Sequence, residues 1–160
     1  MAHHQYQHQE NYQHQENTHL QWKSLLKLGN NCFYKKQWDK AEFFYSEAYD
    51  LLAFCYRKNP MCSDTLMAWI CSCHNLSTLY EQRGKMTLAL RFLMVPHDYL
   101  LEITKSKIAD EDIKLIAFKG ISLTLSPILT FNKKHPICNS CIEEFKSLKS
   151  LLEQHNNVLH

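Results

Sequence analysis

Residues 37–52 read QWDKAEFFYSEAYDLL, and their apolar side chains return at the spacing of an α-helix. Two positions on the apolar side, Ala41 and Ala48, are alanine, although leucine would bury more apolar area. Small side chains at these positions allow the backbone of a second helix to come close. The stretch therefore predicts a helix that crosses a neighbouring helix at short distance.

Apolar residues at helical spacing divide the chain from residue 19 onward into six amphipathic segments. Glycine and proline are scarce, with three and four residues, whereas a sheet-rich chain needs many turn residues. Pro96 lies inside the fourth segment and is expected to kink it or split it in two. The predicted helices span about 19–35, 38–58, Ser63-Asp64 to Arg83-Gly84, 85–104, Asp110 to at least Ser126, which precedes Pro127, and 137–155. The sequence thus predicts an all-α protein of three helical hairpins.

Two segments share a pattern of small, aromatic and turn residues: LLKLGNNCFYKKQWDKAEFFYSEAYDLL at 25–52 and HNLSTLYEQRGKMTLALRFL at 74–93. This pattern resembles the tetratricopeptide repeat, a helical hairpin whose small residues let two helices cross closely. Ala41 and Ala89 are 48 residues apart, more than the family's 34, so the chain resembles a short bacterial-type member with lengthened repeats. It departs from the pattern at Pro96, where the family has a small residue. The positions that carry the match are Leu28, Gly29, Ala41, Tyr45 and Ala48 in the first segment and Leu76, Ser77, Tyr80 and Ala89 in the second.

The resemblance implies a right-handed superhelix of about three hairpins, an α-α solenoid, within one domain over 19–158. Its parts would be a first repeat at about 20–58, a second at about 64–104, and a degenerate repeat or cap at about 110–156. Residues 1–18 are rich in His and Gln and contain a duplicated hexad, YQHQEN, which predicts a disordered or frayed segment. Transition-metal binding by its histidines is the functional alternative for this segment. The alternative for the whole chain is an unrelated helix bundle that contains one repeat-like hairpin.

The resemblance also implies a concave groove lined by the first helix of each repeat, which would bind a peptide or helix of a partner protein. Asn30 and Asn75 match two positions of the carboxylate clamp found in chaperone-binding members of the family. The clamp is incomplete, because Leu26 replaces its first lysine and only Lys114 and Lys119 are candidates in the third hairpin. The expected groove residues are Lys23, Lys27, Asn30, Phe33, Tyr34, His74, Asn75, Thr78, Gln82 and Lys114. The predicted function is that of a non-catalytic adaptor or regulator, with a secretion-type chaperone of the same fold as the alternative.

The cysteines offer a function of another class. His135-x-x-Cys138-x-x-Cys141 has ligand types that zinc accepts, but a structural site needs a fourth ligand. The two cysteines could instead form a thiol–disulfide pair if Cys138 lay at an exposed helix N-terminus. Both also fall on an apolar stripe, which predicts buried helix positions. Cys71 and His74 are a conceivable nucleophile and base, without a third group to orient them. We therefore expect no enzyme, no cofactor and no metal.

Charge and chain ends give expectations about location. The formal charge of +2 does not indicate nucleic-acid binding, for which a basic face is usual. The N-terminus lacks the pattern of a secretory signal, and no uninterrupted apolar run has the length of a membrane span. The odd number of cysteines, seven, favours a reducing compartment. The sequence thus predicts a cytoplasmic protein, with another protein as partner and no membrane.

Overall fold

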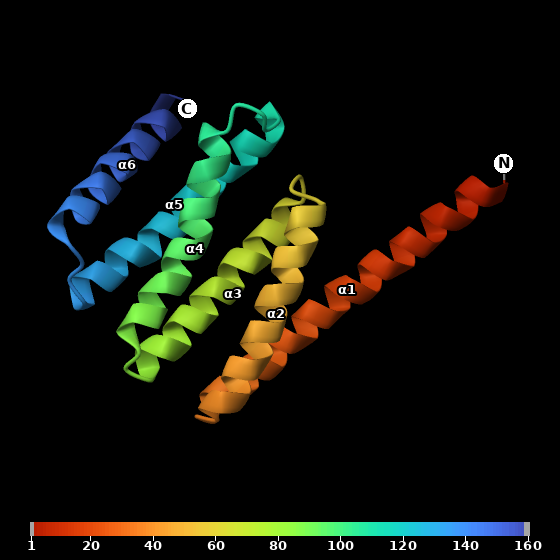
Figure 1. Ribbon diagram of the computed structural model, residues 1–160, viewed down its shortest axis with the longest axis horizontal. Helices are drawn as coiled ribbons and strands as arrows, with labels where there is room; N and C mark the ends of the chain where they lie inside the picture. Colours follow the sequence, from red (N-terminus) through yellow and green to blue (C-terminus); the bar gives the residue numbers. More distant parts are fainter. Residues whose placement is uncertain (1, 159–160) are drawn as a thin grey trace.

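The computed structural model describes the backbone of residues 2–158 and the side chains of residues 17–154. Residues 2–158 form helices only, which confirms the predicted all-α class (Figure 1). The helices are α1 (Ala2–Tyr34), α2 (Trp38–Lys58), α3 (Ser63–Gln82), α4 (Met86–Lys105), α5 (Glu111–Lys134) and α6 (Asn139–Val158).

The helices follow one another across the molecule in chain order, from α1 at one side to α6 at the other (Figure 1). Each helix packs against the next one along the chain, and α3 also contacts α5. The core lies along the middle of this array, where α3 contributes residues such as Leu76 and Leu79, both fully buried. Short connections thus place consecutive helices side by side.

The helix bounds agree with the predicted ranges except at the start of α1 and in α6, which spans Asn139–Val158 instead of 137–155. Pro96 does not split α4, which runs unbroken from Met86 to Lys105. α5 runs beyond Ser126, the minimum that the sequence predicted, and continues through Pro127 to Lys134. A proline removes one backbone donor, and the packing of Ile128 and Phe131 in the core keeps the helix going beyond it.

The largest difference concerns α1, which extends to Ala2 instead of beginning near residue 19. The N-terminal part of α1 points away from the other helices (Figure 1). The side chains of 2–16 lie outside the described residues, so the expectations of fraying and of metal binding by the histidines there stay predictions.

The first two hairpins turn in the same way. After α1, Lys36 adopts φ 58°, the N–H of Gln37 bonds the Cys32 carbonyl at 2.9 Å, and that of Lys36 bonds Phe33. After α3, Gly84 adopts φ 71°, and the N–H of Lys85 bonds the Tyr80 carbonyl at 2.8 Å. Both are Schellman turns, in which a left-handed residue closes the helix. The prediction that Gly84 ends a helix is confirmed.

Close helix crossings occur where the small residues are. Ala41, Ala48 and Ala89 have no exposed surface, and Tyr45 is 3% exposed, as the sequence predicts. A Cβ atom added to Gly29 would lie 2.5 Å from Cδ1 and Cε1 of the Tyr45 ring. α1 and α2 therefore approach each other through a glycine that has no room for a side chain.

We expect Gly29→Ala to lower the free energy of unfolding by roughly 1–2 kcal/mol, because overpacking outweighs the better helix propensity of alanine. Chemical denaturation followed by circular dichroism measures the change. Asn31→Ala, at an exposed position of α1, is the control and should have little effect. If Gly29→Ala instead stabilised the protein, Tyr45 would not be in close contact with residue 29.

Leu28 differs from its expected place in the core, since it is 42% exposed. Its counterpart Leu76, 48 residues later, is fully buried because α3 has helices on both sides. α1 has a substantial contact only with α2, so part of its surface is left uncovered. The position of α1 at the end of the array therefore explains the exposure of Leu28.

By length and composition, α5 is the one helix among the described residues that is long and apolar enough to cross a membrane. The sequence contains no uninterrupted apolar run of this length, because Lys114 and Lys119 interrupt the apolar residues of α5. As a candidate membrane span, this helix was therefore not identified from the sequence. In the structure α5 packs between α4 and α6 and places Ile121, Leu125 and Ile128 in the core. Of its apolar window 33% is buried within the protein, while Leu115 and Leu123 are 49% and 41% exposed.

Candidate functional site

A small pocket gathers five of the ten predicted groove residues. It has a volume of about 120 Å³ and is called here the asparagine pocket. Its lining consists of Asn30, Phe33 and Tyr34 of α1, Tyr45 of α2, and Asn75 and Thr78 of α3. Residues from two predicted repeats therefore face one space, as the resemblance implied.

The two asparagines differ in what they contact. The Tyr45 hydroxyl donates a hydrogen bond of 2.7 Å to Oδ1 of Asn30. Burial, with the nearby Tyr34 and Cys32, raises the pKa of Tyr45 to about 12, so the hydroxyl keeps its proton at neutral pH. Asn75 is half-buried, and its amide has no hydrogen-bond partner among the described residues. Asn30 is thus held in place, while Asn75 is available to a ligand.

Aromatic surface surrounds the two amides. Tyr34 is 83% exposed, and its ring lies edge-on to Phe33 at 6.2 Å between ring centroids. Phe33 also contacts Trp38 edge-on, at 5.4 Å between ring centroids. The pocket therefore combines the unpaired amide of Asn75 with the large exposed ring of Tyr34, which packs on Phe33.

The other predicted groove residues do not line this pocket. Lys23, Lys27 and Gln82 are exposed on α1 and α3. Lys114 lies on α5 and pairs with Glu111 at 2.7 Å. His74 is half-buried, its Nε2 has no partner, and burial lowers its pKa below the ordinary value. The clamp candidates Lys114 and Lys119 therefore do not join Asn30 and Asn75.

Cys71 and His74 do not form an activated pair. Burial raises the pKa of the Cys71 thiol, which favours the unreactive protonated form. Among the described residues neither side chain donates to the other. The geometry provides no base for Cys71.

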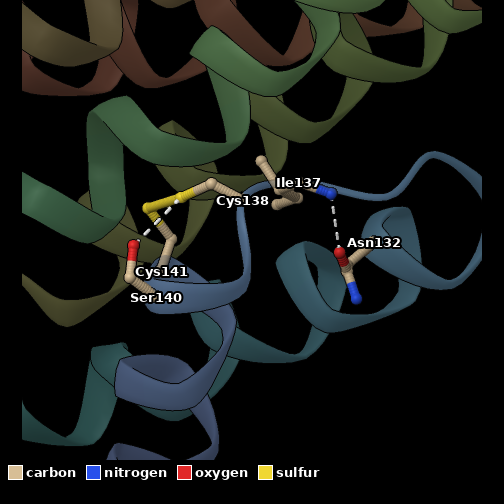
Figure 2. The surroundings of a disulfide bond; sticks show 5 residues. All are labelled: Asn132, Ile137, Cys138, Ser140 and Cys141. Atoms are coloured by element: carbon tan, nitrogen blue, oxygen red, sulfur yellow. Dashed lines mark hydrogen bonds between the residues drawn. A yellow bond between two sulfur atoms is a disulfide. The ribbon is translucent and has the colours of Figure 1, made fainter.

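The C-terminal cysteines are joined in a disulfide, as Figure 2 shows. Cys138 is exposed and immediately precedes α6, where its carbonyl accepts from the N–H of Ile142 at 3.2 Å. Cys141 lies in the first turn of the helix and is half-buried. Asn132 supports the connection, since its Oδ1 accepts from the N–H of Ile137 at 2.8 Å (Figure 2). The expectation that Cys138 is a buried helix position is wrong, because α6 begins after it.

The candidate zinc ligands are engaged elsewhere. Nε2 of His135 lies 3.2 Å from a carboxylate oxygen of Glu81, and Cys138 and Cys141 are bonded to each other. Among residues 17–154 no group of three or more His, Cys, Asp or Glu side chains is placed to hold a metal ion. The arrangement gives no support to a zinc site at these three residues.

Sequence reasoning missed a second cavity, which has a volume of about 390 Å³. It lies between α2, α3 and α4 and is called here the aromatic cavity. It is lined by Tyr49, Ala53, Tyr56, Arg57, Trp69, Val95, Asp98, Tyr99 and Glu102. The available signal was Tyr49 and Tyr56 on one side of α2, with Tyr99 in an acidic stretch of α4.

The chain belongs to the family described as "Protein of unknown function (DUF2753)", whose model matches residues 20–160. No curated protein and no solved structure matches the chain.

Proposed function

We propose that this member of the DUF2753 family is a non-catalytic adaptor or regulator that binds a peptide or helix of another protein at the asparagine pocket. The observation that carries the proposal is the meeting of Asn30 and Asn75, 45 residues apart in sequence, in one pocket with exposed aromatic surface. An asparagine amide offers both a donor and an acceptor, which is what a peptide backbone needs. The ring of Tyr34 would cover an apolar side chain of the partner.

We further propose that the fold is a short superhelix of tetratricopeptide type with repeats of 48 residues. Three features support it. The Schellman turns at Lys36 and Gly84 are 48 residues apart, as are the buried Ala41 and Ala89. Gly29, which contacts Tyr45, and Ser77, which is 3% exposed, have the same separation.

The proposal predicts that loss of the Asn75 amide weakens partner binding without harming the fold. A photo-crosslinking residue at Thr78, which is exposed in the lining of the pocket, identifies the partner in the cells that make the protein. With the purified partner, Asn75→Ala should weaken binding by roughly 1–3 kcal/mol, because a polar group of the partner loses its hydrogen bond on burial. Glu47→Ala, at an exposed position of α2, is the matched control and should bind like the parent.

Asn30 needs a separate variant, because Asn30→Ala also removes the acceptor of the Tyr45 hydroxyl. We expect this change to cost roughly 1 kcal/mol of stability, the value of an ordinary hydrogen bond. A partner that binds Asn75→Ala and Tyr34→Ala as tightly as the parent would show that the pocket is not the site. A secreted client as partner would favour the secretion-type chaperone over an adaptor.

A second candidate function is thiol–disulfide exchange at Cys138 and Cys141. It is favoured by the exposure of Cys138 at the start of α6, because a helix N-terminus stabilises a thiolate. A dithiol reductant would attack Sγ of Cys138 and release Cys141 as thiolate. Its second thiol would then release Cys138, leaving two protein thiols and the oxidised reductant, a transfer of two electrons and two protons.

This candidate predicts how many thiols are titrated in denaturant. Protein prepared without reductant should show five, since Cys32, Cys55, Cys62, Cys71 and Cys73 are free, and all seven after reduction. Cys138→Ser should give the same count before and after reduction, while Cys71→Ser, the control, should keep the difference of two. The disulfide closes a very short loop, so its reduction should change stability little. Seven thiols before reduction would exclude the pair.

A further inference from the structure

The aromatic cavity is walled by four rings, of which Trp69 contacts each of the other three. Tyr56 and Trp69 are stacked, with centroids 6.0 Å apart and planes at 15°. Tyr99 stands edge-on to both, at 6.0 Å from Tyr56 and 5.5 Å from Trp69. Tyr49 adds a tilted ring 6.3 Å from Trp69. The cavity shares no lining residue with the asparagine pocket.

Two polar atoms of this wall have no partner. Trp69 is 5% exposed and Tyr56 is 1% exposed, yet the Trp69 indole N–H and the Tyr56 hydroxyl are buried without a hydrogen bond among the described residues. Burial, with Tyr99 nearby, raises the pKa of Tyr56 to about 12, so its hydroxyl keeps the proton. Buried polar groups are normally satisfied, and these two belong to residues that line a cavity large enough for a small ligand.

The cavity also holds an excess of negative charge. Asp98 and Glu102 come from α4, while Arg57 of α2 is the single basic residue of the lining. Neither carboxylate forms an ion pair with any described residue. Burial and the charge of Glu102 raise the pKa of Asp98, as expected for two carboxylates without a counterion. A bound cation would relieve this repulsion.

We propose that the aromatic cavity binds an organic cation, a protonated or quaternary amine that also carries an oxygen able to accept a hydrogen bond. The faces of tyrosine and tryptophan rings attract cations, and several rings together form the usual enclosure for an alkylammonium group. Asp98 and Glu102 supply the opposite charge. The oxygen of the ligand accepts from the Trp69 indole N–H or the Tyr56 hydroxyl, since the ammonium itself accepts no hydrogen bond.

Such an amine comes either from a free small molecule or from a lysine side chain of a protein, and two probes separate these sources. Choline represents the small molecule, and N-acetyl-lysine N-methylamide represents the side chain. The neutral control is 3,3-dimethylbutan-1-ol, which has the shape and hydroxyl of choline without its charge. Titrations of the full chain are followed by calorimetry and by the NMR resonance of the Trp69 indole N–H.

We expect one of the two amines to bind at least about 10-fold more tightly than the neutral alcohol and to shift the Trp69 indole resonance. Equal binding of choline and the alcohol, with no binding of the lysine derivative, would overturn the assignment of a cation. No binding of either amine at millimolar concentration would overturn the site itself.

The carboxylates provide variants that should fold, because both side chains belong to exposed residues. Asp98→Asn with Glu102→Gln should weaken binding of the amine by about 10-fold or more and leave binding of the alcohol unchanged. Glu47→Gln with Glu144→Gln, exposed acids outside the cavity, removes the same charge and is the matched control. If both pairs weakened binding equally, the effect would be one of net charge, and the cavity would not be the binding site.

Discussion

Replacing Leu100 by alanine is expected to lower the free energy of unfolding by about 2–5 kcal/mol, the range for leucine in a rigid core. Leu100 is fully buried on α4 and contacts α5 at Gly120. The variant loses apolar contacts and leaves a cavity that the packed helices cannot close. Urea denaturation measures the change, and Leu151→Ala, 62% exposed on α6, is the control with an expected loss under about 1 kcal/mol.

The same contact allows a sharper test through Gly120. A Cβ atom added there would lie 2.9 Å from Cδ1 of Leu100, so Gly120→Ala is crowded in the parent protein. In the Leu100→Ala background the new methyl group has space and fills part of the cavity. We therefore expect Gly120→Ala to be stabilising, by roughly 1 kcal/mol, only in that background. Equal effects in both backgrounds would contradict the packing of α4 on α5.

Acidification is expected to destabilise the protein through His97 by about 3 kcal/mol between pH 6.5 and pH 4. His97 has no exposed surface, and burial lowers its pKa from 6.5 to about 4. The unfolded chain therefore binds a proton in this range before the folded chain does. The stabilisation is complete above pH 6.5 and is lost as the pH falls to the folded pKa.

The neutral form of His97 is built into the packing of three helices. Nδ1 lies 2.9 Å from Oγ1 of Thr124, and that hydroxyl donates to the Ile121 carbonyl, so Nδ1 carries the proton. Nε2 is buried without a partner, and Phe145 of α6 stands edge-on to the ring at 5.6 Å. A second proton would place an unpaired charge between α4, α5 and α6.

The test compares stability at several pH values above 4.5 for the parent and for His97→Asn, whose amide can replace the bond from Nδ1. The variant should be less stable at pH 7 but lose less stability on acidification. Burial lowers the pKa of His74 as well, so His74→Asn is the companion variant. It should remove a separate part of the dependence of stability on pH. If His97→Asn left the pH dependence unchanged, His97 would not be the group responsible.

Local signals explain why much of the helix pattern could be predicted. The range of α2 follows from Asp39 near its start and Pro60 after its end, and the end of α3 follows from Gly84. These features act within one turn of chain, so they do not depend on which helix lies next to them. Pro127 is the counterexample, since a residue that usually ends a helix lies inside α5, where core contacts outweigh the lost hydrogen bond.

The candidate sites also differ in how far the sequence could predict them. Asn30 and Asn75 could be expected to line one groove because the resemblance places both on the helix faces that would bind a partner, and they are 45 residues apart, about one helical turn short of the 48-residue spacing. The aromatic cavity could not be foreseen, because its rings come from three helices and each ring alone fits a buried position. The burial of Cys138 was also predicted wrongly, because its exposure depends on where α6 begins.

The sequence by itself determined that this protein is all-α, where α2 and α3 begin and end, and that Ala41, Ala48 and Ala89 lie at close crossings, because side-chain size and spacing act along a single helix. Only the tertiary structure decided which of these faces remain uncovered. Leu28 is exposed and Leu76 is buried at equivalent positions, because a helix at the end of an array has fewer neighbours than one in its middle. In the same way, Tyr56 and Trp69 border an open cavity because burial depends on how neighbouring helices fill the space between them.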